Sequence, residues 1–268
     1  MAGRVVSPRS RLTHHRCTRA AWRPLLVCVV GCTALLVSAC DDPPAAVGPT
    51  PSAAPEPVLT AIPKPEGPPE LSIDDLGPKV GWTRVLLEKK EGPAELAKEL
   101  GEVKEHLSGK DALLKVDRKA KLDWVMAMFA ELEKQGVSTI RVATDSRTEF
   151  PKELKFIPQG KRKDAKECSL VATVLEDRGT AVWKLSGGAA IKRRKGFAGP
   201  DLTTTGETIE QRKATCPDAP DLFLTASEGI EWGLVYDLGA STSVLKKASF
   251  DGFVLLLERP VAGRKVDL

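Results

Sequence analysis

The pattern of apolar positions divides residues 71–260 into two stretches with the same predicted order of elements. In the first stretch, apolar side chains recur at helical spacing over 93–107 and again over 121–136, which predicts two amphipathic helices. Pro93 suits the first turn of the first helix, and Gly136 suits the end of the second. The apolar positions of these helices are Leu96, Leu100, Val103 and Leu107, then Leu122, Val125, Met126, Phe129 and Leu132.

Short apolar runs flank these helices and predict strands. Val85–Leu87 precedes the first helix, Ala112–Val116 separates the two helices, and Ser138–Thr144 follows the second. The order strand-helix-strand-helix-strand predicts an α/β fold of the α+β two-layer sandwich kind, a small mixed sheet with helices on one face, over 71–150.

The second stretch, 168–260, repeats this plan. When Ser227 is aligned with Asp117, Trp232 falls on Leu122 without a gap, a self-similarity that predicts an internal duplication. The predicted elements are a hairpin over 169–188, a weaker helix over 203–216, a strand over 221–227, a helix over 230–248 and a strand over 253–258.

The first 39 residues have the features of a secretory signal peptide. Six arginines and no acid stand between Met1 and Arg23, Leu25–Leu36 is apolar or small, and Val-Ser-Ala precedes Cys40. This ending resembles a bacterial lipobox and predicts that Cys40 is lipidated, which would anchor the chain to a membrane on the periplasmic side of the cell envelope. A plain signal peptide with an incidental cysteine is the alternative. The apolar run is shorter than the ~20 residues that span a bilayer.

Removal of the signal peptide changes the charge. The whole chain has a net charge of +4, but the leader holds six Arg, so the remainder has 34 Lys and Arg against 36 Asp and Glu, a net charge of −2. The basic balance therefore belongs to the leader and predicts no nucleic-acid partner.

Few residues of the mature chain suit metal or nucleophilic chemistry. Besides Cys40 only Cys168 and Cys216 remain, and a pair in an oxidising compartment predicts a disulfide, with two buried thiols as the alternative. His106 is the single remaining histidine and suits a helix end. No zinc ligand set and no G-x-S-x-G motif is present, so we expect no metal, no cofactor and no enzyme activity.

Segments of biased composition separate these parts. Ten of the thirty residues from Asp41 to Glu70 are Pro, which predicts a disordered, extended linker over 40–70 that reaches up to roughly 90 Å. The segment 151–167 is predicted to be a basic connector, and 261–268 a tail. The basic runs Lys161–Lys163 and Lys192–Gly196 are predicted to be solvated loops, with an anionic ligand such as a lipid head group as the alternative for the second.

The stretch 112–144 resembles the periplasmic domain of the ExbD/TolR family of biopolymer-transport proteins. Its apolar strand ends in Asp117, its helix carries Val125, and a Gly136-Val137 turn leads to a strand over Ile140–Thr144. With the preceding helix, the resemblance covers about 80 residues. It implies two ExbD/TolR-like domains, 71–150 and a diverged copy over 168–260 in which Ser227 replaces the Asp.

The chain departs from this family at its N-terminus. Family members have a transmembrane helix with an embedded Asp that relays protons, whereas Leu25–Leu36 contains no acid, and Asp41 and Asp42 follow the predicted cleavage site. The resemblance therefore implies a fold and partners, but no proton conduction.

These implications define two functional hypotheses. The first is a non-enzymatic accessory lipoprotein of Ton/Tol-type transport driven by the proton-motive force, with ExbB/TolQ-like and TonB/TolA-like partners. The second is a structural periplasmic lipoprotein that binds peptidoglycan or spaces the envelope layers.

Overall fold

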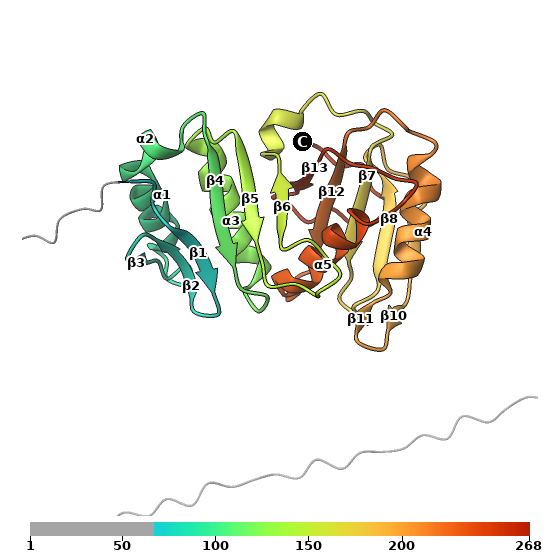
Figure 1. Cartoon of the computed structure of the whole chain (residues 1–268), viewed down its shortest axis with the longest axis horizontal. Coiled ribbons are helices and arrows are strands. Elements are labelled where there is room, and N and C mark those ends of the chain that lie inside the picture. The colour runs from blue at the N-terminus through green and yellow to red at the C-terminus, as the bar shows by residue number, and fades with distance from the viewer. Residues whose placement is uncertain (1–66) are drawn as a thin grey trace, which may run out of the picture. The chain divides into compact units, whose positions relative to one another are not determined.

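The strands and helices of both stretches pack into one mixed α/β structure (Figure 1), which we describe from a computed structural model of residues 67–268. The elements of the first half are β1 (Leu71–Asp74), β2 (Gly77–Val80), β3 (Thr83–Arg84), α1 (Gly92–Glu102), α2 (Lys104–Leu107), β4 (Asp111–Val116), α3 (Leu122–Lys134) and β5 (Thr139–Ala143). Between the halves lie β6 (Glu153–Phe156) and a short 3₁₀ helix, η1 (Gln159–Arg162). The elements of the second half are β7 (Leu170–Val174), β8 (Thr180–Lys184), β9 (Ile191–Arg193), β10 (Lys195–Gly196), β11 (Gly199–Pro200), α4 (Leu202–Lys213), β12 (Asp221–Ala226), α5 (Trp232–Thr242) and β13 (Gly252–Leu255).

Eleven strands form a single sheet in the order β3-β2-β1-β4-β5-β6-β13-β12-β7-β8-β9. In the first half, β1, β4 and β5 are parallel and β2 is antiparallel to β1. In the second half, β7, β12 and β13 are parallel and β8 is antiparallel to β7. Each half therefore runs hairpin, helix, strand, helix, strand, with its strands in the same relative order.

The sequence predicts two small sheets, but β6 joins the strands of both halves into one. Phe156 pairs with Ile140 of antiparallel β5 on one side and with Phe253 of parallel β13 on the other. We expected only a connector over 151–167, because its lysines and two prolines suggest a loop. In the four residues of β6, buried Leu154 and Phe156 nevertheless alternate with exposed Glu153 and Lys155, which is the pattern of a strand with one buried face.

Phe156 also lies at the centre of the shared core. Its ring centroid is 5.3 Å from that of Phe129 on α3 and 5.8 Å from those of Trp232 on α5 and Phe253 on β13. One apolar cluster contains side chains from both halves, including these four rings. The helices α3 and α5 thus pack on the same face of β6.

The start of the fold also differs from the prediction. Val85–Leu87, predicted as a strand, follows β3 in an irregular segment, although Val85 is fully buried. The first strand is β1, in which Leu71 and Ile73 are buried and alternate with partly exposed residues. Four residues adjoining a Pro-rich segment give too short an alternation to be recognised in the sequence. The first predicted helix is also interrupted, at Val103, between α1 and α2.

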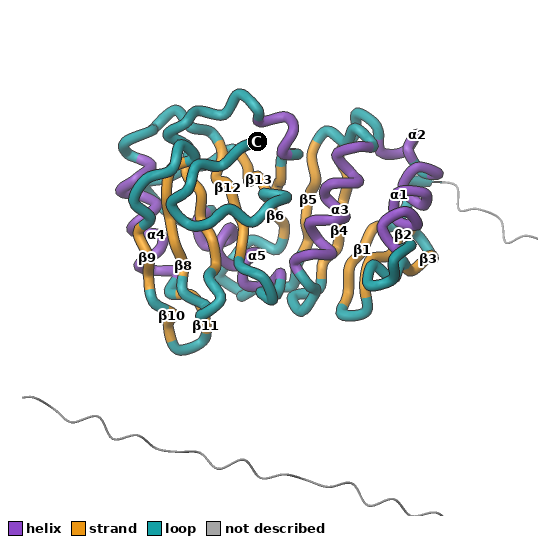
Figure 2. Tube along the Cα trace, turned by 180° about the vertical axis from the view of Figure 1, so that it is seen from behind, coloured by secondary structure: helices purple, strands orange, loops and turns teal. Residues whose placement is uncertain are grey.

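The two halves differ in how their sheet faces are covered. The segment after β13 folds back over the second half, where Val266 N donates to Leu185 O at 2.9 Å and Trp183 Nε1 donates to Arg264 O at 3.0 Å. Figure 2 shows this C-terminal segment in front of the strands of the second half, whereas α1 and α3 lie in front of the first-half strands. The predicted tail over 261–268 is therefore part of the second half's packing. Within residues 67–268, the face of the first-half sheet that lies opposite α1 and α3 has no such cover.

Candidate functional site

The uncovered face of the first-half sheet is the candidate site. Along β4, Asp111, Leu113 and Lys115 are exposed while the residues between them are buried, whereas every residue of β12 is buried. We use the term open face for the exposed side of β1, β4, β5 and β6, which faces the viewer in Figure 1. Its residues are Ser72, Asp74, Asp111, Leu113, Lys115, Arg141, Glu153 and Lys155.

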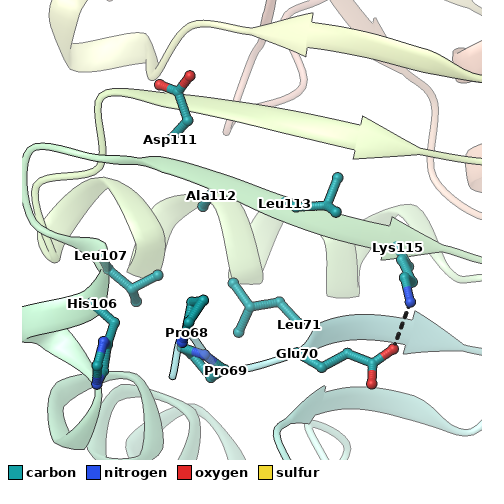
Figure 3. Close-up of a pocket in the computed structure, with 10 residues that line it drawn as sticks. All are labelled: Pro68, Pro69, Glu70, Leu71, His106, Leu107, Asp111, Ala112, Leu113 and Lys115. Carbon is teal, nitrogen blue, oxygen red and sulfur yellow. Dashed lines mark hydrogen bonds and ion pairs between the residues drawn. The ribbon is translucent and has the colours of Figure 1, made fainter. Parts of the chain in front are cut away.

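A hollow of about 370 Å³ lies at the beginning of β4 on this face (Figure 3). Pro68 and Pro69 line it on one side and His106 on another, with Leu113 and Lys115 along its floor. Lys115 Nζ lies 2.8 Å from Glu70 Oε1, and this ion pair lowers the pKa of the Glu70 carboxyl. The lining of the hollow thus combines the apolar rings of Pro68 and Pro69 with an ion pair, Lys115–Glu70, whose charges compensate each other.

A second hollow, of about 450 Å³, lies at the carboxyl ends of β1, β4 and β5. Lys115 lines both hollows, so together they follow β4 from one end to the other. The second hollow is lined by more charges, including Asp74, Asp117, Asp145 and Lys152. Ligands of open parallel sheets bind at this edge, outside the carboxyl ends of the strands.

Asp74 is the most strongly held anion of the open face. Its carboxylate accepts hydrogen bonds from both terminal nitrogens of Arg84, with Nη2–Oδ2 at 2.6 Å, and lies 3.1 Å from Lys79 Nζ. The bond from Arg84 is the largest cause that holds the pKa of Asp74 well below its usual range, and the backbone N–H of Leu76 adds to it. Asp74 therefore stays charged and tied to the β1–β2 hairpin.

Asp117, the residue that ends the family-like strand, lines the second hollow. Its Oδ1 accepts the backbone N–H of Lys119 at 2.7 Å, and its own N–H donates to Ile73 O at 2.8 Å. At the aligned position, Ser227 N donates to Val174 O at 2.8 Å, the corresponding bond to the neighbouring parallel strand. The carboxylate of Asp117 shapes a turn at the rim of the hollow.

The remaining pairs on the open face are exposed and mixed in charge. Arg141 forms two hydrogen bonds to Glu153, at 2.7 and 2.9 Å, and Thr139 Oγ1 donates to Asp111 Oδ1 at 2.5 Å. Leu113, 45% exposed, is paired in register with Arg141 of β5. A shallow, mixed surface with one central apolar side chain suits the docking of an extended chain more than the enclosure of a small molecule.

The predicted chemistry-bearing residues lie apart from one another. His106 Nε2 is 3.5 Å from Glu105 Oε1, at the end of α2. Within residues 67–268, no group of three or more His, Cys, Asp or Glu side chains is placed to hold a metal ion. In the same part of the chain, no helix is both long and apolar enough to cross a membrane.

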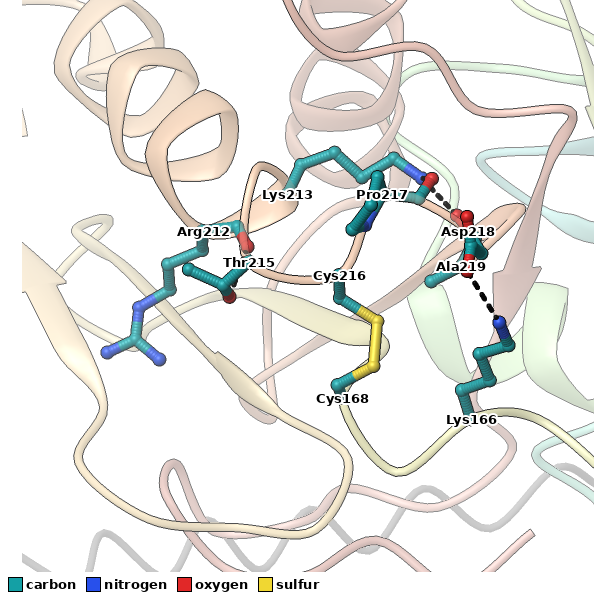
Figure 4. Close-up of a disulfide and its surroundings, with 9 residues drawn as sticks. All are labelled: Lys166, Cys168, Arg212, Lys213, Thr215, Cys216, Pro217, Asp218 and Ala219. Atoms are coloured by element: carbon teal, nitrogen blue, oxygen red, sulfur yellow. Dashed lines mark hydrogen bonds and ion pairs between the residues drawn. A yellow bond between two sulfur atoms is a disulfide. The ribbon is translucent and has the colours of Figure 1, made fainter.

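Cys168 and Cys216 form the expected disulfide, with Cα atoms 5.8 Å apart (Figure 4). It joins the segment before β7 to the turn after α4. Beside it, Lys213 donates its Nζ to the backbone oxygens of Pro217 and Ala219, which fixes the same turn. This part of the second half is a structural clamp. Cys40 lies outside the described residues.

An ion pair between a buried carboxylate and a partly exposed arginine closes the seam between the halves. Arg118, which follows β4, donates to both carboxylate oxygens of Asp237 on α5, at 2.9 and 2.7 Å, and Ser146 Oγ adds a bond at 3.1 Å. The side chain of Asp237 is only 3% exposed. Trp232 Nε1 donates to Thr144 Oγ1 at 2.8 Å across the same seam. These bonds fix the halves to each other.

Lys121 and Glu231, each directly before a helix, form an isolated antiparallel bridge across this seam. The two residues are equivalent when Ser227 is aligned with Asp117. An antiparallel bridge between equivalent positions is the arrangement that a local two-fold axis produces.

The two basic runs have different surroundings. In the run over 161–163, Arg162 pairs with buried Asp221 and Lys161 donates to Ser138 O at 3.1 Å, so two of its three cations are used within the fold. The run Lys192–Gly196, predicted as a loop, instead forms β9 and one strand of the small β10–β11 hairpin.

The open face was not recognised in the sequence, because the two aligned strands have nearly the same pattern. Ala112–Leu114 is apolar throughout, as is the aligned run Leu222–Leu224, and Asp111 falls on Asp221. A continuous apolar run indicates burial on both faces, so exposed Leu113 gives no signal of a solvated face. Comparisons with protein-family models, with curated proteins and with solved structures find no match to this chain.

Proposed function

We propose that this chain is a non-enzymatic, partner-binding lipoprotein of the cell envelope, an accessory to Ton/Tol-type transport, and that the open face is its docking surface. The observation that carries the proposal is the difference between the halves: the second-half sheet is covered on both faces, while the first half leaves one face to solvent along the whole of β4.

The order of elements supports the family resemblance. Both halves run hairpin, helix, strand, helix, strand with the same strand order, and the bridge between Lys121 and Glu231 pairs equivalent positions. We propose that the halves are two copies of one ExbD/TolR-like domain, fused into a covalent pair. Such a tether makes the pairing independent of concentration. In this proposal the second half, which carries Ser227, supports the first half, and the first half, which carries Asp117, binds the ligand.

The mode of docking follows from the edges of the sheet. Strand addition needs an exposed strand edge, but β6 already occupies the edges of β5 and β13, and the outer edges are the two-residue β3 and the three-residue β9. We therefore propose that an extended, Pro-rich segment of a TonB/TolA-like partner lies across the open face, along the two hollows. Pro68 and Pro69 of this chain already line one of these hollows.

Co-purification from native membranes tests this function. The full chain should retain ExbB/TolQ-like or TonB/TolA-like proteins, and L113R combined with K115E should reduce their recovery by about tenfold, because both side chains line the hollows and central contacts dominate binding energy. The matched control is V244R with K163E, since Val244 and Lys163 are exposed away from the open face.

Two outcomes would count against the proposal. Equal loss of partners in the control variant would show that charge or anchoring, and not the open face, governs recovery. Retention of peptidoglycan alone by the unmodified chain would favour the structural alternative, a lipoprotein that spaces the envelope layers.

A further inference from the structure

The β10–β11 hairpin presents an apolar ring to solvent at its tip. Phe197 stands between the two strands and is fully exposed, at 110% of the reference value, and Gly196 and Ala198 beside it are exposed as well. In Figure 1 the hairpin projects beyond the strands of the second half. Packing within the described fold therefore does not explain why a phenylalanine stands at this exposed position.

The base of the hairpin is fixed to the body of the second half. Gly199 and Pro200 are buried, and Gly199 has a φ of +131° close to Leu234 of α5. Asp201 then caps α4, with Oδ1 accepting the backbone N–H of Thr204 at 3.1 Å. The tip is therefore presented in a defined direction.

Four cations precede the exposed ring in the sequence, Lys192, Arg193, Arg194 and Lys195. Lys192, Arg194 and Lys195 are exposed, and within the described residues none of them forms an ion pair or a side-chain hydrogen bond. Arg193 differs, because its Nε donates to Thr208 Oγ1 at 2.9 Å. No acid occurs between Lys192 and Pro200. Lys195 thus lies in the hairpin itself, and Lys192 and Arg194 lie in the segment that leads into it, while Asp201 at its base caps α4.

We propose that this hairpin is a membrane contact, in which Phe197 inserts at the head-group boundary of an anionic phospholipid bilayer and Lys192, Arg194 and Lys195 bind lipid phosphates. An apolar side chain bordered by cations is the composition that favours the interface of an anionic membrane. The hairpin tip projects from the fold, whereas both hollows lie in the first half. A projecting tip suits contact with a bilayer surface better than it suits the binding of a soluble anion. This contact is separate from docking at the open face and from anchoring at Cys40.

Photo-crosslinking of the full chain tests the contact. A photoreactive phenylalanine analogue replaces Phe197, and the protein is reconstituted into vesicles of phosphatidylcholine and phosphatidylglycerol in equal parts. We expect phospholipid adducts at position 197, detected by mass spectrometry. The same analogue at Val261, which is 71% exposed, controls for mere proximity to the vesicle and should give few adducts.

Charge reversal tests the role of the cations. The triple variant K192E, R194E and K195E should lower the lipid adduct at position 197 by about tenfold or more, as should vesicles of phosphatidylcholine alone. An intact Cys168–Cys216 disulfide verifies the fold of each variant. Absence of lipid adducts at 197, equal adducts at 261, equal yield in uncharged vesicles, or adducts in cells only with protein or cell-wall fragments would each overturn the proposal.

Discussion

Asp74 shows how single residues stabilise the open face. Its carboxylate holds Arg84 and Lys79, the two cations of the β1–β2–β3 hairpin, and its side chain is 33% exposed. Because these partners lower the pKa of Asp74 in the folded state, the ionised form stabilises the fold. Partial exposure to solvent screens the interaction and limits its contribution.

The acid dependence of stability follows from this lowered pKa. An unfolded Asp has a pKa of about 3.9, so the contribution of Asp74 is fully present above that value and is lost as the pH falls from about 4 toward the lowered pKa of the folded state. D74N should reduce the free energy of unfolding by about 1 kcal/mol at neutral pH and by less at pH ~3. Urea denaturation at the two pH values measures both effects.

Asp75 provides the control for this prediction. It is the neighbouring residue, it is exposed, and it has the same chemistry. D75N should leave stability nearly unchanged at both pH values. An equal loss for D74N at neutral and acidic pH would contradict the assignment.

At the scale of elements, β6 determines the architecture. A strand of four residues converts what would be two sheets into one and brings Phe129, Trp232 and Phe253 around Phe156. Its Leu154 also packs close to Gly239 of α5, where a Cβ would lie 3.3 Å from the leucine side chain. The absence of a side chain at Gly239 therefore lets α5 approach the joined sheet.

F156A should be among the most destabilising single substitutions in this chain. It removes the ring that contacts both halves and leaves a cavity, a change that costs about 3–5 kcal/mol in protein cores. Urea denaturation measures the loss, with F197A as the matched control at a fully exposed phenylalanine. A loss below about 1 kcal/mol for F156A would show that β6 is not packed as described.

The sequence predicts the elements whose pattern is local and long. The helices over 121–136 and 230–248 and the strands before them are recognised because their apolar positions recur within one segment. The strands β1 and β6 are too short for this, and β6 is a strand only because β5 and β13, distant in sequence, supply its hydrogen-bonding partners. The open face could not be predicted from Asp111–Lys115, because Leu113 makes this run as apolar as the aligned Leu222–Leu224, and its hollows depend on tertiary packing.

The whole molecule combines two halves of similar topology and unequal exposure. The second half has a disulfide, a sheet buried on both faces and a C-terminal segment packed across it, which are features of a rigid support. The first half shares the core of the second through β6 and α5, yet keeps one face of its sheet in solvent. On this division rests our proposal that the second half is the support and the first half binds the partner.

The most direct test of this division is site-specific photo-crosslinking in living cells. A photoreactive amino acid at Leu113 on the open face is compared with the same amino acid at Val244, which is also exposed but belongs to the second half. We predict a protein adduct from position 113, identified by mass spectrometry as an ExbB/TolQ-like or TonB/TolA-like protein, and no such adduct from position 244. Adducts of the same partners from both positions, or adducts from position 113 that contain only cell-wall material, would contradict the account.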